Sequence, residues 1–424
     1  MTALLITIFI AGYLAIAFES AIKINKAAIA LITGVLSWMV YIIFSDNKGI
    51  ILGQLSKSLG ELSGILFFLM GAMAIVELID AHDGFEIISS RIKVQDKRRL
   101  LWTISLITFF ISPVLDNLTT AIVMVSLLRK FVIDPQERLY FSGMIIIAAN
   151  AGGVWSPIGD VTTTMLWIGG QISSIKIVYS LLLPSLFCLM VPLLILSYRM
   201  KALETIAVKT TIKAKQRIKQ DQYLVFFSGF LIMISVPVFK ILTGLPPYMG
   251  MLIGLGILWT ITEIIHGNKN ERDKHVLSVA YALQRIDTPS ILFFLGILLS
   301  ISALDSIGIL HKLAGSVNAI LSNKNIIVII TGFFSSVIDN VPLVAASQGM
   351  YSLTLYPIDH QLWIFLAYCT GTGGSLLLIG SAAGIAVMGM GKITFLDYLK
   401  KITFLALLGY LSGVIIYLLQ YYLF

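Results

Sequence analysis

Long apolar stretches alternate with short polar ones along almost the whole chain. Eight of these stretches approach the ~20 apolar residues that cross a bilayer as a helix, and they cover about 3–18, 27–44, 60–80, 176–198, 222–240, 247–265, 289–305 and 397–424. Two others, 100–131 and 325–354, carry a polar pair and are predicted to dip into the membrane and return as helical hairpins. Two more, 139–172 and 361–392, contain glycine-rich breaks and are predicted to be broken spans. The pattern predicts an all-α polytopic membrane protein.

The two halves of the chain repeat one set of motifs. Three motifs recur in the same order at an offset of 221 to 226 residues: Gly64–Leu69 and Ser290–Leu295, Asp116-Asn117 and Asp339-Asn340, Gly152-Gly153 and Gly373-Gly374. This offset predicts two repeats, 1–200 and 222–424, joined by a polar linker over 201–221. Each repeat is expected to contain five spans, one of them broken, plus one re-entrant hairpin. Because five is odd, the repeats would be inverted, a symmetry common in secondary transporters.

Composition and charge support a membrane location. Of the 424 residues, 58% are hydrophobic and only 12% are charged. Under the predicted topology, 24 of the 30 lysines and arginines lie in loops of one face, which the positive-inside rule makes cytoplasmic. The linker is therefore expected in the cytoplasm and both termini outside, in a bacterial-type cytoplasmic membrane. The net charge of +8 then reflects topology, and no nucleic-acid partner is expected.

The two Asp-Asn pairs are the first candidate site. A charged side chain at mid-bilayer costs roughly 3 kcal/mol on insertion scales, so acids in two matching places indicate a binding centre. Carboxylate, amide and freed backbone oxygens suit small hard cations. The alternative is structural: the asparagine caps a short helix and a hydrogen bond holds the aspartate. Because the residue before a proline is pushed away from helix, the turn of the first hairpin is expected at Ser112.

The two glycine-rich breaks add further polar groups. The first contains Asn150, Gly152, Gly153, Ser156, Pro157, Gly159, Asp160, Thr162 and Thr163. Asp160 is a third intramembrane acid, whose counterpart in the second half is Ser381, so the two breaks are not equivalent. The second break offers neutral oxygens and close-approach glycines: Thr370, Thr372, Gly373, Gly374, Ser375, Gly380 and Ser381. Each hydroxyl could equally well bond only to its own helix backbone.

Glu77, Asp80 and His82 end the third span. One interpretation is an interfacial polar cluster, and the other is a proton-access or pH-sensing cluster, because histidine titrates near neutrality. The remaining histidines are expected in solvated loops: His266, His275, His311 and His360. The two cysteines, Cys188 and Cys369, lie in apolar runs and are expected to pack without a disulfide.

At these motifs the sequence resembles the NhaD-type sodium/proton antiporters of the ion transporter superfamily. The resemblance covers nearly the whole chain and is carried by Ser112–Thr120, Asn150–Asp160, Val76–His82, Ser335–Asn340 and Thr372–Ser375. It implies paired hairpins that meet broken helices, a scaffold that forms a homodimer, and elevator-like movement of a transport domain. It also implies an ion site built from Asp116, Asn117, Asn150, Asp160, Thr162, Thr163, Ser335, Asp339, Asn340 and Ser375. Sodium itself is expected at Asp116, Asn117 and Asp160.

The expected activity is exchange of sodium or lithium for protons, serving pH and salt homeostasis, with no cofactor. A carboxyl group at membrane depth favours its neutral form, whereas a bound cation favours the ionised form, so the two compete. No phosphate-binding G-x-x-x-x-G-K-[ST] motif is present, so ATP-driven pumping is not expected. Alternatives are a sodium-coupled dicarboxylate carrier, an arsenite exporter and, more remotely, an intramembrane aspartyl protease. The chain is expected not to be an enzyme.

Overall fold

The structure is a computed structural model that describes residues 1–17, 19–92, 96–132, 134–200, 220–267, 277–321, 323–377, 380–391 and 393–423. These ranges fold into helices and contain no β-strand. Most of the predicted linker, together with His275, lies outside the described residues.

The first half of the chain forms ten helices within the described ranges. They are α1 (Thr2–Ala17), α2 (Glu19–Ile22), α3 (Lys26–Ile43), α4 (Lys48–Ala81), α5 (Glu86–Arg91), α6 (Lys97–Leu115), α7 (Asn117–Phe131), α8 (Pro135–Gly153), α9 (Val161–Ile168) and α10 (Ser174–Arg199). Several begin at a polar cap, as helices prefer: the Asn25 side chain accepts from the Ala27 N–H at 2.8 Å, and Asp96 accepts from the Arg99 N–H at 2.7 Å.

The second half forms a similar series. Its described helices are α11 (Gln220–Thr243), α12 (Pro247–His266), α14 (Val279–Arg285), α15 (Thr288–Ser306), α16 (Ile309–Ile320), α17 (Lys324–Phe334), α18 (Asn340–Met350), α19 (Gln361–Gly373), α20 (Ala382–Gly391), α21 (Phe395–Lys401) and α22 (Thr403–Leu423). Each half therefore contains a helix–turn–helix, α6–α7 or α17–α18, followed by an interrupted pair, α8–α9 or α19–α20.

Eight described helices are long and apolar enough to cross a bilayer, and a ninth span results if the bent pair α16 and α17 counts as one. The eight are α3, α4, α6, α10, α11, α12, α15 and α22. With 16 residues, α1 is a shorter apolar helix. The protein is thus an all-helical, multi-pass membrane protein.

Three boundaries differ from the prediction. The third span, expected over 60–80, is a continuous helix of 34 residues; at 1.5 Å per residue it measures about 51 Å, longer than the ~30 Å hydrocarbon core. The segment 309–320, expected as loop, is helix α16. The turn expected at Ser112 is absent, because α6 continues through Pro113 and ends at Leu115.

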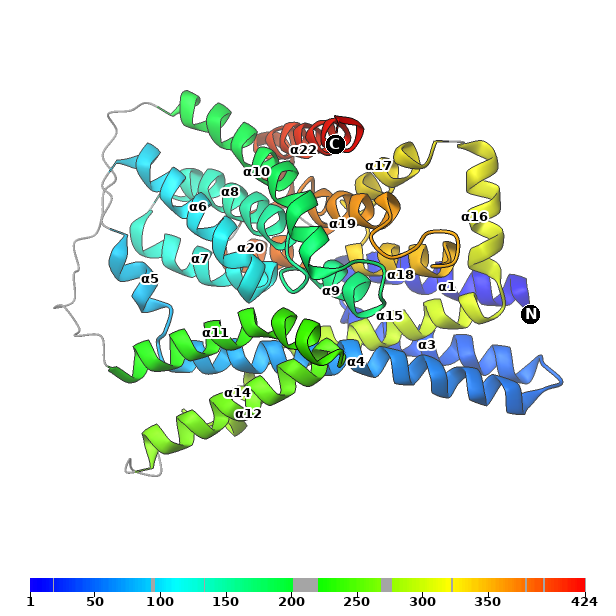
Figure 1. The fold of residues 1–424 in the computed structure, drawn as a ribbon. Coiled ribbons are helices and arrows are strands. Elements are labelled where there is room, and N and C mark those ends of the chain that lie inside the picture. Colours follow the sequence, from blue (N-terminus) through cyan, green and yellow to red (C-terminus); the bar gives the residue numbers. More distant parts are fainter. Residues whose placement is uncertain are drawn as a thin grey trace.

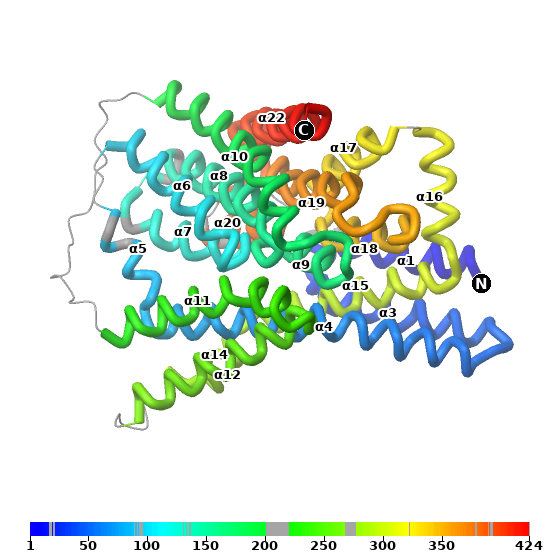
Figure 2. The backbone as a smooth tube through the Cα atoms, viewed as in Figure 1, coloured from blue at the N-terminus to red at the C-terminus, as the bar shows by residue number. Residues whose placement is uncertain are grey.

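The helices pack into two groups (Figure 1). In the first group α3 packs on α15, α4 packs on α12 and α15, α1 packs on α3, and α11 packs on α12. In the second group each helix–turn–helix packs on its interrupted pair, α7 packs on α20, and α9 packs on α18. Helices α10 and α22 lie side by side along one edge of this group (Figures 1 and 2). The groups meet where α15 contacts α18, α4 contacts α9 and α11 contacts α6.

The contact between α3 and α15 depends on small residues. A Cβ added at Gly34 would lie 2.5 Å from the Gly296 carbonyl oxygen, and one added at Gly296 would lie 2.4 Å from the Ala30 backbone. The Trp38 indole N–H donates to the Leu299 carbonyl at 3.0 Å. The backbones thus approach closely, as small residues permit between membrane helices.

Candidate ion-binding site

The first hairpin turns at Asp116. Its backbone has φ 70° and ψ 160°, a region that is essentially restricted to glycine and that costs other residues of order 1–3 kcal/mol. Its carboxylate caps α7, accepting the Thr119 N–H at 2.8 Å and the Thr119 hydroxyl at 2.8 Å. Two short bonds to a charged acceptor offset this strain, since such bonds contribute about 1.5–3 kcal/mol each.

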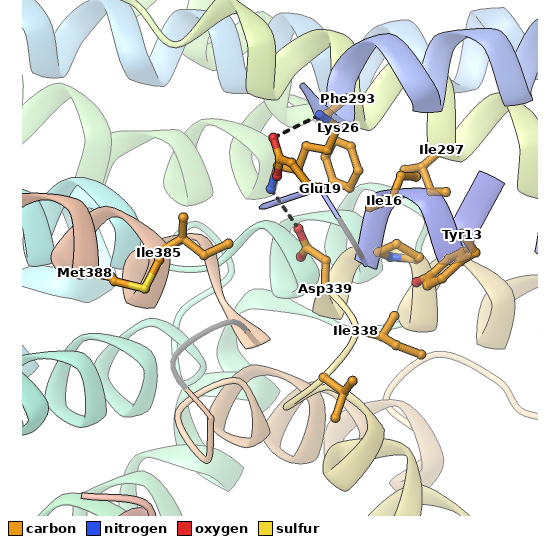
Figure 3. Close-up of a pocket in the computed structure, with 12 residues that line it drawn as sticks. Tyr13, Ile16, Glu19, Lys26, Phe293, Ile297, Ile338, Asp339, Ile385 and Met388 are labelled. Atoms are coloured by element: carbon orange, nitrogen blue, oxygen red, sulfur yellow. Dashed lines mark hydrogen bonds and ion pairs between the residues drawn. The ribbon is translucent and has the colours of Figure 1, made fainter. Parts of the chain in front are cut away.

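The second hairpin presents its acid differently. Asp339 has φ −48° and makes no side-chain capping bond to α18. The residue that corresponds to Thr119, 223 positions later, is Pro342, which has neither an N–H nor a hydroxyl to donate. Asp339 instead forms an ion pair with Lys26 at 3.7 Å, and the Lys26 ammonium group lies 4.5 Å from the Phe293 ring centroid (Figure 3).

Glycines let each hairpin approach the break beside it. A Cβ at Gly152 would lie 2.5 Å from the Phe109 carbonyl oxygen, and a Cβ at Gly373 would lie 2.1 Å from the Gly332 carbonyl oxygen. Pairs within each break are equally tight, because added Cβ atoms at Gly153 and Gly374 would meet the carbonyl oxygens of Gly159 and Gly380 at 2.3 and 2.9 Å. Gly159 and Gly380 in turn face Pro113 and Ser336 of the two hairpins.

Asp160 is the residue on which both hairpins converge. It caps α9 by accepting the Thr162 N–H at 3.1 Å, and it is 1% exposed. Its carboxylate also accepts amide N–H groups from Asn117 of the first hairpin at 3.3 Å and from Asn340 of the second at 3.4 Å. No lysine or arginine in the described ranges forms an ion pair with it. Within the described chain, this buried carboxyl group is thus contacted by neutral donors and by no basic side chain.

Asn150 connects the first break to the second. Its side-chain oxygen accepts from Asn117 at 3.0 Å, and its amide nitrogen donates to the hydroxyls of Ser375 at 2.9 Å and Ser381 at 3.2 Å. The position that corresponds to Asn150 in the second half is Gly371, where an added Cβ would lie 3.0 Å from an Asp160 carboxylate oxygen. The absence of a side chain there leaves room for the carboxylate.

One cavity collects the acids and amides. Its lining includes Asp116, Asn117, Asp160, Asp339, Asn340 and Ser381. A wider vestibule shares Met73, Leu118, Ser290 and Ala382 with this cavity. The vestibule is also lined by charged side chains, namely Glu19, Lys26, Glu77, Arg285 and Asp287. The predicted acids therefore line one space that adjoins a charged entrance.

Comparison with known proteins identifies the family. Residues 13–365 match the family described as citrate transporter. Sodium/proton antiporter 1 of Arabidopsis thaliana is 47% identical over 407 residues, which cover 96% of this chain and 70% of that protein. Sodium/proton antiporter 2 of the same organism is 45% identical over 96% of this chain and 97% of its own length. The chain belongs to the NhaD-type sodium/proton antiporters within the citrate transporter family.

A bacterial relative is more distant. The Na(+)/H(+) antiporter NhaD of Vibrio cholerae serotype O1 is 29% identical over 97% of this chain and 90% of its own length. The resemblance expected from the motifs is therefore confirmed at the level of the family. The relatives are transporters, which agrees with the prediction that this NhaD-type chain is not an enzyme.

Several predicted site residues of this NhaD-type chain donate hydrogen bonds from their side chains to backbone carbonyl groups. Ser335 donates to the Thr370 carbonyl at 2.6 Å, as Ser112 does to the Ala149 carbonyl at 2.6 Å in the first half. Ser156 donates to the Pro113 carbonyl at 2.7 Å, and the Thr163 hydroxyl donates to the Asp160 carbonyl at 2.8 Å. The hydroxyls of the second break could either serve the site or bond only to their own helix. Thr370 and Thr372 donate to carbonyls of their own helix at 2.7 and 2.6 Å.

The cluster at the end of α4 is separate from the acid cavity. Arg285 pairs with Glu77 at 3.4 Å and with Asp80 at 3.3 Å. The His82 Nδ1 lies 2.7 Å from the Leu78 carbonyl, and its Nε2 lies 2.7 Å from His266 Nε2. The expectation of a solvated His266 is wrong, because it is 5% exposed and stacks on His82. His266 ends α12, so the helix packing that buries α12 on α4 also buries this ring.

Two further histidines lie away from the cavity, and three residues near it or its entrance were not among the predicted ones. His311 lies 3.7 Å from Asp305 and is largely exposed. His360 is half-buried, and it caps α19 because its Nδ1 accepts the Leu362 N–H at 3.1 Å. Among the missed residues, Lys26 is the first residue of a span. A lysine at that position, rather than in the middle of a loop, was a sequence signal that could have indicated a functional charge. The repeat offset pointed to Gly371 opposite Asn150. No sequence signal connected Arg285 to Glu77, which lies more than two hundred residues away.

Proposed function

We propose that this chain exchanges sodium ions for protons across a membrane. The observation that carries the proposal is the environment of Asp160, a carboxylate 1% exposed and bonded to neutral amides of both hairpins. An isolated buried charge is costly and is normally neutralised or paired. The relatives that match nearly the whole chain are named sodium/proton antiporters. Site chemistry and kinship thus support one activity.

Competition for the same oxygens would produce the exchange. A proton or a sodium ion can each neutralise a carboxylate in the cavity, but one carboxylate cannot bind both fully. Asn117 uses its amide nitrogen as donor to Asn150 and Asp160, which leaves its amide oxygen available as a ligand. Sodium, or lithium in its place, would bind at Asp116, Asn117 and Asp160.

The donor set is suited to a hard alkali cation. Within the ranges that the structure describes, no three His, Cys, Asp or Glu side chains are close enough to hold one metal ion together. The remaining ligands of a bound sodium would therefore be amide and backbone oxygens, which hard cations accept. At the first break, in the described part of the second break and at the hairpin tips, the backbone leaves regular helix, which membrane proteins tolerate where the backbone is buried in protein or lines a cavity.

We further infer an inverted repeat and an elevator-like movement. Helix pairs of the two halves match in a crosswise way: α3 with α15 corresponds to α12 with α4, and α7 with α20 corresponds to α18 with α9. The two helix–turn–helix units extend from opposite ends of the bundle (Figure 1). The two helix groups would then be a scaffold and a mobile transport domain. Dimerisation through the scaffold is a prediction from the family resemblance.

Orientation and proton access are part of the same proposal. The last residues of α5, α7, α10 and α12 lie at one end of the molecule (Figure 1). In the sequence, basic segments that we expect in the cytoplasm follow these helices. The vestibule contains Glu77 and Arg285, so the Glu77, Asp80 and His82 cluster would lie on the cytoplasmic route of protons to the acid cavity. The membrane would be a bacterial-type cytoplasmic membrane.

A carrier of citrate or another dicarboxylate is the rival that the family description raises. Three acids line the cavity, and the one basic side chain beside them in the described chain, Lys26, is already paired with Asp339. An anionic substrate would be repelled there. The arsenite exporter and the intramembrane protease gain no support from the relatives.

Fluorescence dequenching in everted vesicles tests the proposal. Adding sodium should release the imposed proton gradient with the wild type and should not do so with Asp160→Asn, which keeps the shape but cannot ionise. The control is Asp46→Asn, since Asp46 is an exposed carboxylate between α3 and α4, and it should behave as the wild type. Sodium-driven uptake of labelled citrate without proton exchange would overturn the proposal.

A further inference from the structure

The second hairpin carries a counter-charge that the first one lacks. Asp339 pairs with Lys26, whereas Asp116 and Asp160 pair with no lysine or arginine in the described ranges. We propose that Lys26 is a tethered counter-cation for Asp339, so that transported cations are bound by the Asp116 and Asp160 half of the site alone. This assignment rests on the proposed exchange function and specifies which acids serve it.

The surroundings of Lys26 suit a fixed charge. The side chains of Lys26 and Asp339 are only 21% and 16% exposed. The ammonium group lies over the Phe293 ring at 4.5 Å, and the Lys26 backbone N–H donates to the Glu19 carboxylate at 3.0 Å (Figure 3). The ring attracts the cation, and Glu19 holds the first turn of α3 in place. The ammonium group is thereby kept beside the second hairpin.

The second hairpin leaves its acid free for this partner. Asp339 makes no capping bond because Pro342 occupies the position where Thr119 donates twice to Asp116. A carboxylate without donors from its own helix needs another source of stabilisation. Lys26 supplies it from α3, which belongs to the other helix group.

The second half has no equivalent of Lys26 beside the first hairpin. The residue 221 positions after Lys26 is Pro247, which begins α12 as Lys26 begins α3. The two halves therefore differ at this position: a lysine lies beside the acid of the second hairpin, whereas the matching residue, Pro247, is uncharged. Of three acids in the cavity, one is neutralised within the protein, and two remain for ions from solution.

Two interpretations of Asp339 make different predictions. If Asp339 ligates the transported ion directly, its charge is required for exchange whether or not Lys26 is present. If Lys26 neutralises it, the two charges are needed only as a pair, and removing both together should be tolerated far better than removing either one.

Four variants separate these interpretations: Lys26→Met, Asp339→Asn, the double variant of both, and Lys26→Arg. We expect each neutralising single variant to lower exchange about tenfold, because one leaves an unpaired acid and the other an unpaired cation beside the ion site. The double variant should recover at least half of wild-type exchange, and Lys26→Arg should stay near wild type. Equilibrium binding of radioactive sodium to purified protein should give the same number of ions per chain for wild type and double variant.

Controls keep the result interpretable. Lys57→Met removes the lysine of an exposed pair with Glu61, 3.9 Å apart, and should leave exchange unchanged. Melting temperatures in detergent should fall for the neutralising single variants and recover in the double variant. A folded double variant no more active than the weaker single variant would overturn the proposal. Failure of the proposed function itself would look different, because the wild type would then show no sodium-dependent exchange.

Discussion

The two hairpin tips begin from the same dipeptide and end with opposite arrangements. In the first, Asp116 adopts φ 70° and its carboxylate is bonded twice to Thr119 of its own helix. In the second, Asp339 adopts φ −48° and pairs with Lys26 of a distant helix. The difference traces to one position, where Pro342 replaces Thr119 and removes both donors.

This difference has a mechanical meaning. An acid that is satisfied by its own helix keeps its partners wherever the hairpin moves. An acid that is satisfied by Lys26 connects its hairpin to the group containing α3 and α15, and any relative movement of the groups must change that contact. If the two groups move as we propose, the first tip would carry its ion with it, and the contact between Asp339 and Lys26 would change with the relative position of the groups.

The first prediction concerns the acid of the first tip and has the largest expected effect. Asp116→Asn removes the charge that we assign to the transported cation, so sodium-dependent proton movement should fall at least about a hundredfold, as loss of a buried charge partner costs roughly 3–5 kcal/mol. Dequenching in everted vesicles measures it. If Asp116→Asn were active and Asp339→Asn inactive, the assigned roles of the two tips would be reversed.

The second prediction exchanges the position that distinguishes the tips. Thr119→Pro removes both donors to Asp116. Because each contributes about 1.5–3 kcal/mol, exchange should fall on the order of a hundredfold. Thr119→Val removes only the hydroxyl and should have a smaller effect. Titration of the exchange rate against sodium concentration gives the change in apparent affinity. Equal losses in both variants would show that the Thr119 N–H bond does not matter.

The third prediction tests the space opposite Asn150. In Gly371→Ala the new Cβ would lie 2.1 Å from Val154 Cγ1 and 3.0 Å from the Asp160 carboxylate, so the carboxylate must shift. Overpacking of this kind costs typically 1–3 kcal/mol, and we expect about a tenfold loss of sodium affinity. Gly60→Ala is the control, because nothing lies within 4 Å of the added atom. Unchanged affinity in Gly371→Ala would mean that the position of Asp160 is not critical.

The fourth prediction has the smallest effect. Ser375→Ala and Ser381→Ala each remove one acceptor of the Asn150 amide. A neutral hydrogen bond contributes about 1 kcal/mol, so each variant should lose roughly threefold to fivefold in sodium affinity. The double variant should lose more than the sum, since Asn150 would then have no acceptor from the second break. Additive losses would argue against a shared role in orienting Asn150.

The sequence predicted which polar residues line the cavity, but it did not predict which of them form hydrogen bonds with one another. An Asp-Asn pair in an apolar run, repeated at a nearly constant offset, is costly enough in a membrane to predict a binding centre without coordinates. The inequality of the breaks was also visible, because Ser381 stands where the offset expects a second Asp160. Which of these groups bond to one another was not visible, since Asn150, Asn117 and Asp160 meet across three helices.

Two errors show where local rules failed. The expected turn at Ser112 does not form: α6, which packs along α8, continues through Pro113 and turns at the next polar residue, Asp116. His266 was expected in solvent because it ends an apolar run, yet the neighbouring helix buries it against His82. In both cases a tertiary contact outweighed a local preference.

The sequence by itself determined that this chain spans a membrane many times and that its halves share one pattern, and it predicted the three acids and two amides that line one cavity. Hydropathy, charge distribution and repeat offset report these properties because each depends on the order of residues along the chain. Only the tertiary structure decided that Lys26 pairs with Asp339, that Gly371 makes room for Asp160, and that the Asp116 carboxylate is bonded to Thr119. The first two are contacts between distant helices, and the third depends on a backbone turn whose direction is set by the packing around it.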